Sequence, residues 1–362
     1  MNVIPHCRRI QKTIIRKINS LRTYKGMDMS RIIIRFSILV ALGCSALSVM
    51  FSQIALPVIL DTIAVGGSGG MDYITCDPAK HRIFISHATH GEVFDYVTRK
   101  PVGTIANTPG IHGIAIVPEF GKGFTTNGKE KTSTIFDLST FAEIKKITVT
   151  GEKPDAILYE PKTKRVFTFN GGGENCTAID AKTNSIVGTL ALGGGPEAAV
   201  ADGKGKVFVN IESTNEIVQF DAASLKIISR WPVAPAATPT GLSMDRKNHR
   251  LFVGGRNQVL AILDAKTGKA VANFPIGKGV DGTAFDAETG MIYVSNKDGS
   301  LDMFEEDSPN SFELAGKVLT SPGAKTLVLD PVSHKVFLPC ARSVDGPGGA
   351  KGEMMVFVVG RR

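Results

Sequence analysis

Hydrophobic and polar positions along the chain repeat at intervals of about 40 residues. One Phe or Tyr follows a short polar turn in every repeat, and these aromatic residues are 40 to 44 positions apart. Around each aromatic, apolar and polar residues alternate and β-branched side chains are frequent, which is typical of β-strands. No segment after residue 57 has helical periodicity. The series of aromatics is Phe84, Phe124, Phe167, Phe208, Phe252, Tyr293 and Phe337.

A second series marks a turn later in each repeat. An acidic residue ends an apolar segment, and a Ser or Thr follows three positions on. Side-chain oxygens at such spacing accept backbone N–H groups, so the pattern predicts a capped turn between two strands. The acid and hydroxyl pairs are Asp95 with Thr98, Asp137 with Thr140, Asp180 with Thr183, Asp221 with Ser224, Asp264 with Thr267, and Glu305 with Ser308.

Each repeat therefore predicts four strands, which we name A to D in chain order, with the aromatic on B and the acid at the end of C. Four strands in 40 to 45 residues are the unit of a β-propeller blade, and seven units predict an all-β, seven-bladed propeller. The seventh repeat has no room for strand D. The segment at about 58–65 resembles the D strands, so we expect it to complete the last blade and leave one ring over residues 57–362.

Charge divides the chain into two parts. The 362 residues carry a net charge of +8, and residues 1–35 contain nine Lys or Arg residues against one acid. The remainder is therefore neutral overall, and nothing in it favours a nucleic-acid partner. The basic stretch precedes the apolar segment Ile38–Phe51, and small residues such as Ala46, Ser48 and Ala55 offer cleavage positions. This order is typical of a secretory signal peptide.

Residues 1–52 are accordingly predicted to be a basic leader. We expect a cleaved signal peptide or an uncleaved N-terminal anchor, with the protein in the periplasm, at the cell surface or secreted. Membrane contact is expected only through an uncleaved leader. Three cysteines lie outside the leader, at Cys76, Cys176 and Cys340, and we expect small buried side chains there.

The repeats resemble the YVTN-repeat β-propeller family, which includes YncE-like bacterial exported proteins. The motif is an aromatic followed three residues later by Asn, with an acid closing the next strand. It stands at Phe124–Asn127, Phe167–Asn170 and Tyr293–Asn296, whereas the other repeats have His87, Ile211, Gly255 and Cys340 in place of Asn. The resemblance covers about residues 57–362. It implies the propeller fold and export, but such propellers serve many functions.

A candidate site follows from one position per repeat. Strands A begin and strands B end on one face of a propeller, which we call the top face. The residue about twelve positions before each aromatic is polar, and we expect it to begin strand A at the mouth of the central channel. The ends of strands B add further polar residues. The predicted ligand-binding set is Asp72, His112, Asp155, Glu197, Thr240, Asp281 and Lys325, with His87, Asn127, Asn170 and Asn296.

This mouth predicts two possibilities. Carboxylates and imidazole bind Ca²⁺, Zn²⁺ or Mn²⁺, and the candidate ligands are Asp72, His112, Asp155, Glu197 and Asp281. With four acids against Lys325 and His112, we expect a negative mouth that prefers a divalent cation or cationic ligand. The alternative is a wet channel mouth that binds nothing specific. A Gly- and Pro-containing loop at 341–352 is expected on the same face.

Three classes of function remain open. The first is a binding protein that takes a small molecule or a protein at its top face. The second is a metal-dependent, lactonase-like hydrolase using the same mouth, and the third is a redox accessory propeller. The sequence has no C-x-x-C-H motif, which excludes a covalent c-type haem, and it has neither G-x-S-x-G nor H-E-x-x-H.

Overall fold

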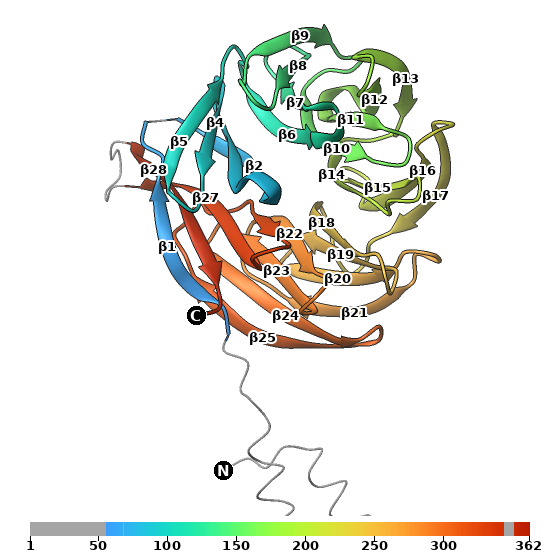
Figure 1. Ribbon diagram of the computed structural model, residues 1–362. Helices are drawn as coiled ribbons and strands as arrows, with labels where there is room; N and C mark the ends of the chain where they lie inside the picture. The colour runs from blue at the N-terminus through green and yellow to red at the C-terminus, as the bar shows by residue number, and fades with distance from the viewer. Residues whose placement is uncertain (1–55, 68, 344–350) are drawn as a thin grey trace, which may run out of the picture. The chain divides into compact units, whose positions relative to one another are not determined.

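Seven four-stranded antiparallel sheets form a ring in the computed structural model, which describes residues 56–67, 69–343 and 351–362. Figure 1 shows the sheets following one another around a central axis. The prediction of an all-β, seven-bladed propeller is confirmed. The described residues contain three short 3-10 helices, η1 (Pro78–Lys80), η2 (Pro118–Phe120) and η3 (Gly171–Gly173), and no α-helix. None of these helices is long and apolar enough to cross a membrane.

The first four blades each contain four consecutive strands. Blade one is β2 (Met71–Asp77), β3 (Arg82–His87), β4 (His90–Asp95) and β5 (Lys100–Ile105). Blade two is β6 (Ile111–Val117), β7 (Lys122–Asn127), β8 (Thr132–Asp137) and β9 (Glu143–Thr148). Blade three is β10 (Pro154–Glu160), β11 (Arg165–Asn170), β12 (Asn175–Asp180) and β13 (Ser185–Ala191). Blade four is β14 (Pro196–Ala201), β15 (Lys206–Ile211), β16 (Glu216–Asp221) and β17 (Lys226–Pro232).

The remaining three blades include the one that joins the two ends of the ring. Blade five is β18 (Pro239–Asp245), β19 (Arg250–Gly255), β20 (Val259–Asp264) and β21 (Ala270–Pro275). Blade six is β22 (Val280–Asp286), β23 (Met291–Asn296), β24 (Ser300–Ser308) and β25 (Ser311–Leu319). Blade seven is β26 (Val328–Asp330), β27 (Lys335–Ser343), β28 (Lys351–Gly360) and β1 (Val58–Ala64).

Strand β1 closes the ring as predicted. It pairs antiparallel with β28, and the register runs from Val58 opposite Gly360 to Ala64 opposite Met355. Ile63 is 1% exposed and packs in a core cluster with residues of blades one and seven. The first described strand thus supplies both ladder hydrogen bonds and core packing to the last blade.

The recurring aromatics form the core between blades. All seven are at most 2% exposed. Phe167 on β11 meets Phe220 on β16 of the next blade edge to face, with ring centroids 5.4 Å apart. Phe84 on β3 meets Phe136 on β8 of the next blade in a tilted arrangement, with ring centroids 6.2 Å apart. One large ring per repeat fills the space between neighbouring sheets, which explains the period that the sequence shows.

The predicted acid-capped turn is present in five blades. In each, the acid accepts backbone N–H groups from the residues two and three positions later; Asp137, for example, accepts from Ser139 and Thr140 at 2.8 Å. In blade six the prediction is wrong, because Glu305 lies within a longer hairpin and pairs with Glu313. The chain turns later, at Pro309 and Asn310, where proline has no N–H to donate to a ladder.

The described cysteines are unpaired. Cys176 and Cys340 are buried and Cys76 is half-buried. The predicted leader at 1–52 lies outside the described residues. The loop expected at 341–352 is shorter than predicted, since β27 and β28 extend into it, and its centre at 344–350 also lies outside the described residues.

Candidate functional site

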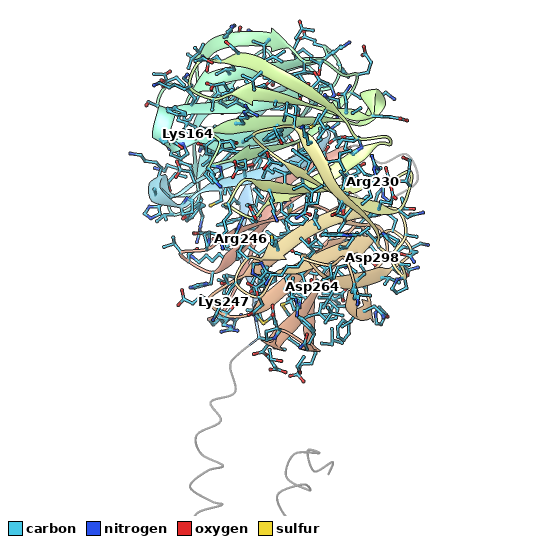
Figure 2. All side chains as sticks on the ribbon, turned by 90° about the vertical axis from the view of Figure 1, so that its right-hand side faces the viewer. Lys164, Arg230, Arg246, Lys247, Asp264 and Asp298 are labelled. Atoms are coloured by element: carbon cyan, nitrogen blue, oxygen red, sulfur yellow. The ribbon has the colours of Figure 1, made fainter. Side chains whose placement is uncertain are left out.

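The top face is the one reached by the B–C turns. In the edge-on view of Figure 2, Asp298 of a B–C turn and Lys247 of an A–B turn lie toward opposite sides of the ring. Six of the seven predicted mouth residues occupy the second position of strand A, not the first. The first position packs inward, as Ile111 and Val280 show at 3% and 1% exposed, and alternation turns the next side chain toward the channel. The exception is Lys325, which precedes β26.

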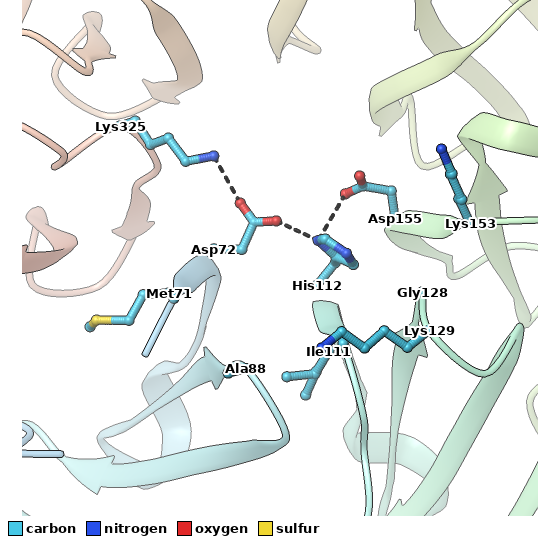
Figure 3. A pocket seen from close by; sticks show the side chains of 12 residues that line it. Met71, Asp72, Ala88, Ile111, His112, Gly128, Lys129, Lys153, Asp155 and Lys325 are labelled. Atoms are coloured by element: carbon cyan, nitrogen blue, oxygen red, sulfur yellow. Dashed lines mark hydrogen bonds and ion pairs between the residues drawn. The ribbon is translucent and has the colours of Figure 1, made fainter. Parts of the chain in front are cut away.

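Four of these side chains, one from each of four neighbouring blades, form a continuous polar chain (Figure 3). The Lys325 ammonium lies 3.1 Å from Oδ1 of Asp72, whose Oδ2 lies 2.6 Å from Nδ1 of His112. The same Nδ1 lies 3.8 Å from Oδ1 of Asp155. All four are half-buried. The ring brings blade seven beside blade one, so Lys325 and Asp72 meet although 253 positions separate them.

The pKa values in this chain follow from burial and pairing. Burial tends to raise the pKa of Asp72, but the His112 hydrogen bond and the Lys325 charge outweigh it and hold that pKa below its usual value. The hydrogen bond to Asp72 raises the pKa of His112 against the opposing effect of burial. Burial raises the pKa of Asp155 to about 6, although the nearby His112 charge opposes this.

The chain of charged side chains continues beyond Lys325 into blades six, five and four. Lys325 also contacts Asp281, and Arg256 lies 3.7 Å from Asp281 and 2.9 Å from Glu212. Burial, with the charges of Asp155 and Glu212, raises the pKa of Glu197 to about 9. Glu212 was missed by the sequence reasoning. Its signal was present, because it directly follows a B strand, as Arg256 does in the next blade.

Thr240 does not line the mouth, contrary to the prediction. It is 1% exposed, and its hydroxyl donates to the backbone carbonyl of Val280 in the next blade at 2.7 Å. A short hydroxyl at this position reaches the neighbouring backbone, whereas a longer carboxylate projects into the channel. Thr240 therefore joins two blades.

The three predicted asparagines also point away from the mouth. Asn127, Asn170 and Asn296 are fully buried inside their own blades. The Asn170 amide donates to Asn175 at 2.7 Å and to Thr177 at 3.0 Å on the neighbouring strand, and Asn127 bonds Thr132 and Thr134 in the same way. The prediction that they contact a ligand at the mouth is therefore wrong. They connect strands B and C of their own blades by hydrogen bonds. The side-chain amide N–H groups of all three donate to residues of the next strand, so these buried donors are satisfied.

His87 occupies the equivalent position in blade one. It ends β3, is 5% exposed, and faces His90 and Glu92 of the next strand. It is thus grouped with blade-one residues and not with the carboxylates of strands A.

A hollow of about 550 Å³ opens beside the polar chain, and a smaller channel of about 190 Å³ follows along strands A. The hollow is lined by three lysines and His112 and by only two acids, Asp72 and Asp155. This side of the mouth therefore does not have the negative charge that the sequence predicts. Lys129 and Lys153 are exposed and come from loops of blades two and three. The smaller channel is lined largely by apolar and small residues, with Tyr73 among them. The lining of the hollow is Gly70, Met71, Asp72, Ala88, Gly110, Ile111, His112, Gly128, Lys129, Lys153, Asp155 and Lys325.

Three of the five predicted metal-ligand candidates come together. Donor atoms of Asp72, His112 and Asp155 lie within 4.8 Å of one another, which would let them share one ion. Glu197 and Asp281 are not part of this group. Lys325 beside Asp72 supplies a positive charge that competes with a cation.

Comparison with known proteins supports the fold and a distant relationship. No family model matches the chain. It is 24% identical over 196 residues to proteins named "Uncharacterized protein YncE" from Salmonella typhi and Salmonella typhimurium. The match covers 51% of the chain, which thus spans about half (53%) of those relatives. This similarity accords with the YVTN-repeat resemblance without establishing membership.

Solved propellers are similar in structure and distant in sequence. The WD40 repeats of RRP9 superpose with a TM-score of 0.74 at 9% identity, over 84% of this chain and 99% of that one. Hydrazine synthase of Kuenenia stuttgartiensis superposes with a TM-score of 0.67 at 16% identity, over 75% and 92%. At such identities the likeness shows the fold alone.

Proposed function

We propose that this protein is a binding propeller whose mouth takes a small molecule bearing a carboxylate or phosphate group and several hydroxyl or amine groups. The carrying observation is the hollow beside the Lys325–Asp72–His112–Asp155 chain, with Lys129 and Lys153 at its edge. Lysine ammonium groups bind anions, and carboxylates accept hydrogen bonds from hydroxyl or amine groups. The propeller fold and the distant YncE similarity support a binding scaffold.

The ion-pair chain favours binding because its side chains are already oriented. Asp72 is held between Lys325 and His112, so little side-chain freedom is lost when a ligand arrives. Asp155 contacts His112 at 3.8 Å and retains oxygen atoms for a hydroxyl donor. Lys129 and Lys153 are exposed and approach from two blades, which suits an anionic group at the entrance.

The test uses D-gluconate and inorganic phosphate as probes in calorimetric titrations. We expect saturable binding of at least one, weakened about tenfold or more in the Lys129→Gln/Lys153→Gln variant, since tenfold corresponds to ~1.4 kcal/mol. The matched control is Lys80→Gln/Lys247→Gln, which removes two exposed lysines from A–B turns on the other face. Absence of binding for both probes, or equal binding by the mouth variant, would contradict the proposal.

A second candidate is a divalent cation held by Asp72, His112 and Asp155, favoured by the donor atoms that lie within 4.8 Å. His112 would have to release its proton to become a ligand. Such an ion is what a metal-dependent, lactonase-like hydrolase would need. Calorimetric titrations with Ca²⁺ and Mn²⁺ test this candidate. It would be favoured over the first if one of these ions bound to the wild type and not to Asp72→Asn/Asp155→Asn, while neither gluconate nor phosphate bound.

We also propose export through the predicted leader, on the basis of the basic stretch and the apolar segment Ile38–Phe51. Mass spectrometry of natively expressed protein should find a mature N-terminus close to residues 46–56. An intact Met1 or Met27 terminus on protein from the cytoplasm would refute it.

A further inference from the structure

A cluster of metal-binding side chains lies at the tip of the first hairpin of blade one, apart from the chain of mouth residues. Strands β3 and β4 are joined by Ala88 and Thr89, and His87 pairs directly with His90 across the hairpin. Directly paired residues share one face of a sheet, and so do residues two apart on a strand. His87, His90 and Glu92 therefore project to the same side.

The donor atoms have the spacing of ligands around one ion. His90 Nε2 lies 2.9 Å from Glu92 Oε1, and His87 Nδ1 lies 3.6 Å from the same oxygen. One ligand atom from each of the three lies within 4.8 Å of the others. Metal–ligand distances of about 2.0 Å in a tetrahedral zinc site place ligand atoms about 3.3 Å apart, so the cluster needs little rearrangement.

Neighbouring groups hold the two rings in ligating orientations. The Thr89 hydroxyl lies 3.2 Å from Nδ1 of His90, which directs the other ring nitrogen toward Glu92. The backbone of Gly67 and Gly69 covers the far edge of the His87 ring, since a Cβ at Gly67 would lie 2.9 Å from Cε1. Nδ1 of His87 faces Glu92, whose Oε1 lies 3.6 Å away.

Burial and charge suit a cation. The side chains of His87, Glu92 and His90 are 7%, 20% and 29% exposed, so the site is mostly dry and still reachable. Within the described part of the chain, the only ion-pair partners of Glu92 are these two histidines. One carboxylate facing two imidazoles can bind a divalent ion. The ion would take the place of the proton that a histidine and a glutamate otherwise share.

We propose that His87, His90 and Glu92 form a zinc-class metal site at the tip of the β3–β4 hairpin. Two imidazole nitrogens and one carboxylate oxygen select Zn²⁺ and similar transition ions over Ca²⁺, which prefers oxygen ligands. The three side chains leave a fourth position for water or a ligand atom. The site is independent of the proposed anion-binding function and differs from the oxygen-rich Asp72–His112–Asp155 group in its ion preference.

The experiment titrates chelator-treated protein with Zn²⁺ and, separately, with Ca²⁺. We expect one zinc ion to bind at the hairpin and to raise the melting temperature, with no comparable effect of Ca²⁺. His90→Gln and Glu92→Gln should each weaken this zinc binding at least about tenfold. His249→Asn is the matched control, because His249 lies in an A–B turn with a φ of 56°, which asparagine also adopts.

Two further measurements keep the result unambiguous. Melting of each metal-free variant separates loss of ligand from loss of fold, and Glu92→Gln keeps the shape of the side chain if His90→Gln unfolds. The Asp72→Asn/Asp155→Asn variant should bind zinc as the wild type does. Lack of zinc binding by the wild type, unchanged binding in folded His90→Gln and Glu92→Gln, or loss of binding in Asp72→Asn/Asp155→Asn would each overturn the proposal.

Discussion

Deletion of residues 57–66 should lower the free energy of unfolding by at least about 4 kcal/mol, measured by chemical denaturation and calorimetry. The deletion removes strand β1 (Val58–Ala64), which provides the outer ladder of blade seven along β28. It also removes Ile63, which is 1% exposed and packs with Val356 and Phe337 of that blade. The exposed edge of β28 should in addition promote association, visible as larger species in size-exclusion chromatography.

Point variants separate core packing from the loss of a whole strand. Ile63→Ala should cost about 3 kcal/mol, because it leaves a cavity in the core between blades one and seven. Val58→Ala is the matched control on the same strand; Val58 is 37% exposed, and the expected cost is within about 0.5 kcal/mol. If the deletion variant unfolded at the same denaturant concentration and temperature as the full chain, the conclusion that β1 closes the ring would be wrong.

The propeller could be predicted from the sequence because one structural requirement repeats in every blade. Each pair of neighbouring sheets needs a large side chain between them, which fixes the series from Phe84 to Phe337. Each C–D turn needs an acceptor for its backbone N–H groups, which fixes the series of acids. Glu305 departs from that series because Pro309 moves the turn, and the composition of one turn overrides the period.

The sequence predicts which strand positions lie near the mouth, but not which of their side chains face it. Position in the repeat correctly placed Asp72, His112 and Asp155 together, since the ring carries equivalent residues to one axis. Period alone does not reveal whether a side chain turns to the channel or into its blade, so Asn170 and Thr240 were misplaced. It also omits loop residues such as Lys153, whose charge changes the balance of the hollow.

Pairing across the mouth depends on which blades are neighbours and on side-chain length. Lys325 reaches both Asp72 and Asp281 because its long side chain extends from the loop before β26 toward the blades on either side. Arg256 similarly connects Glu212 with Asp281. The sequence supplies these charges, but their partners follow only from the geometry of the ring. Glu197 is the mouth carboxylate whose pKa is raised furthest, and this has a measurable consequence.

Glu197→Gln should stabilise the protein at pH 9 by about 2 kcal/mol or more relative to the wild type, and should change stability little at pH 4. Burial, followed by the charges of Asp155 and Glu212, raises the pKa of Glu197 from the ordinary 4.5 to about 9. Between those values the folded state binds the proton and the unfolded state does not. Folding therefore becomes less favourable as the pH rises through this range.

Glutamine has the shape of protonated glutamate and carries no charge at any pH, so the variant escapes this loss. Urea unfolding of both proteins at pH 4, 7 and 9 measures the difference, which should grow steadily with pH. Glu152→Gln is the matched control, since that side chain is 65% exposed in its surface pair with Lys131. Its difference from the wild type should stay within about 0.5 kcal/mol. A Glu197→Gln variant less stable than the wild type at pH 9 would mean that the carboxylate is charged in the folded protein and is stabilised there by the cations of the mouth.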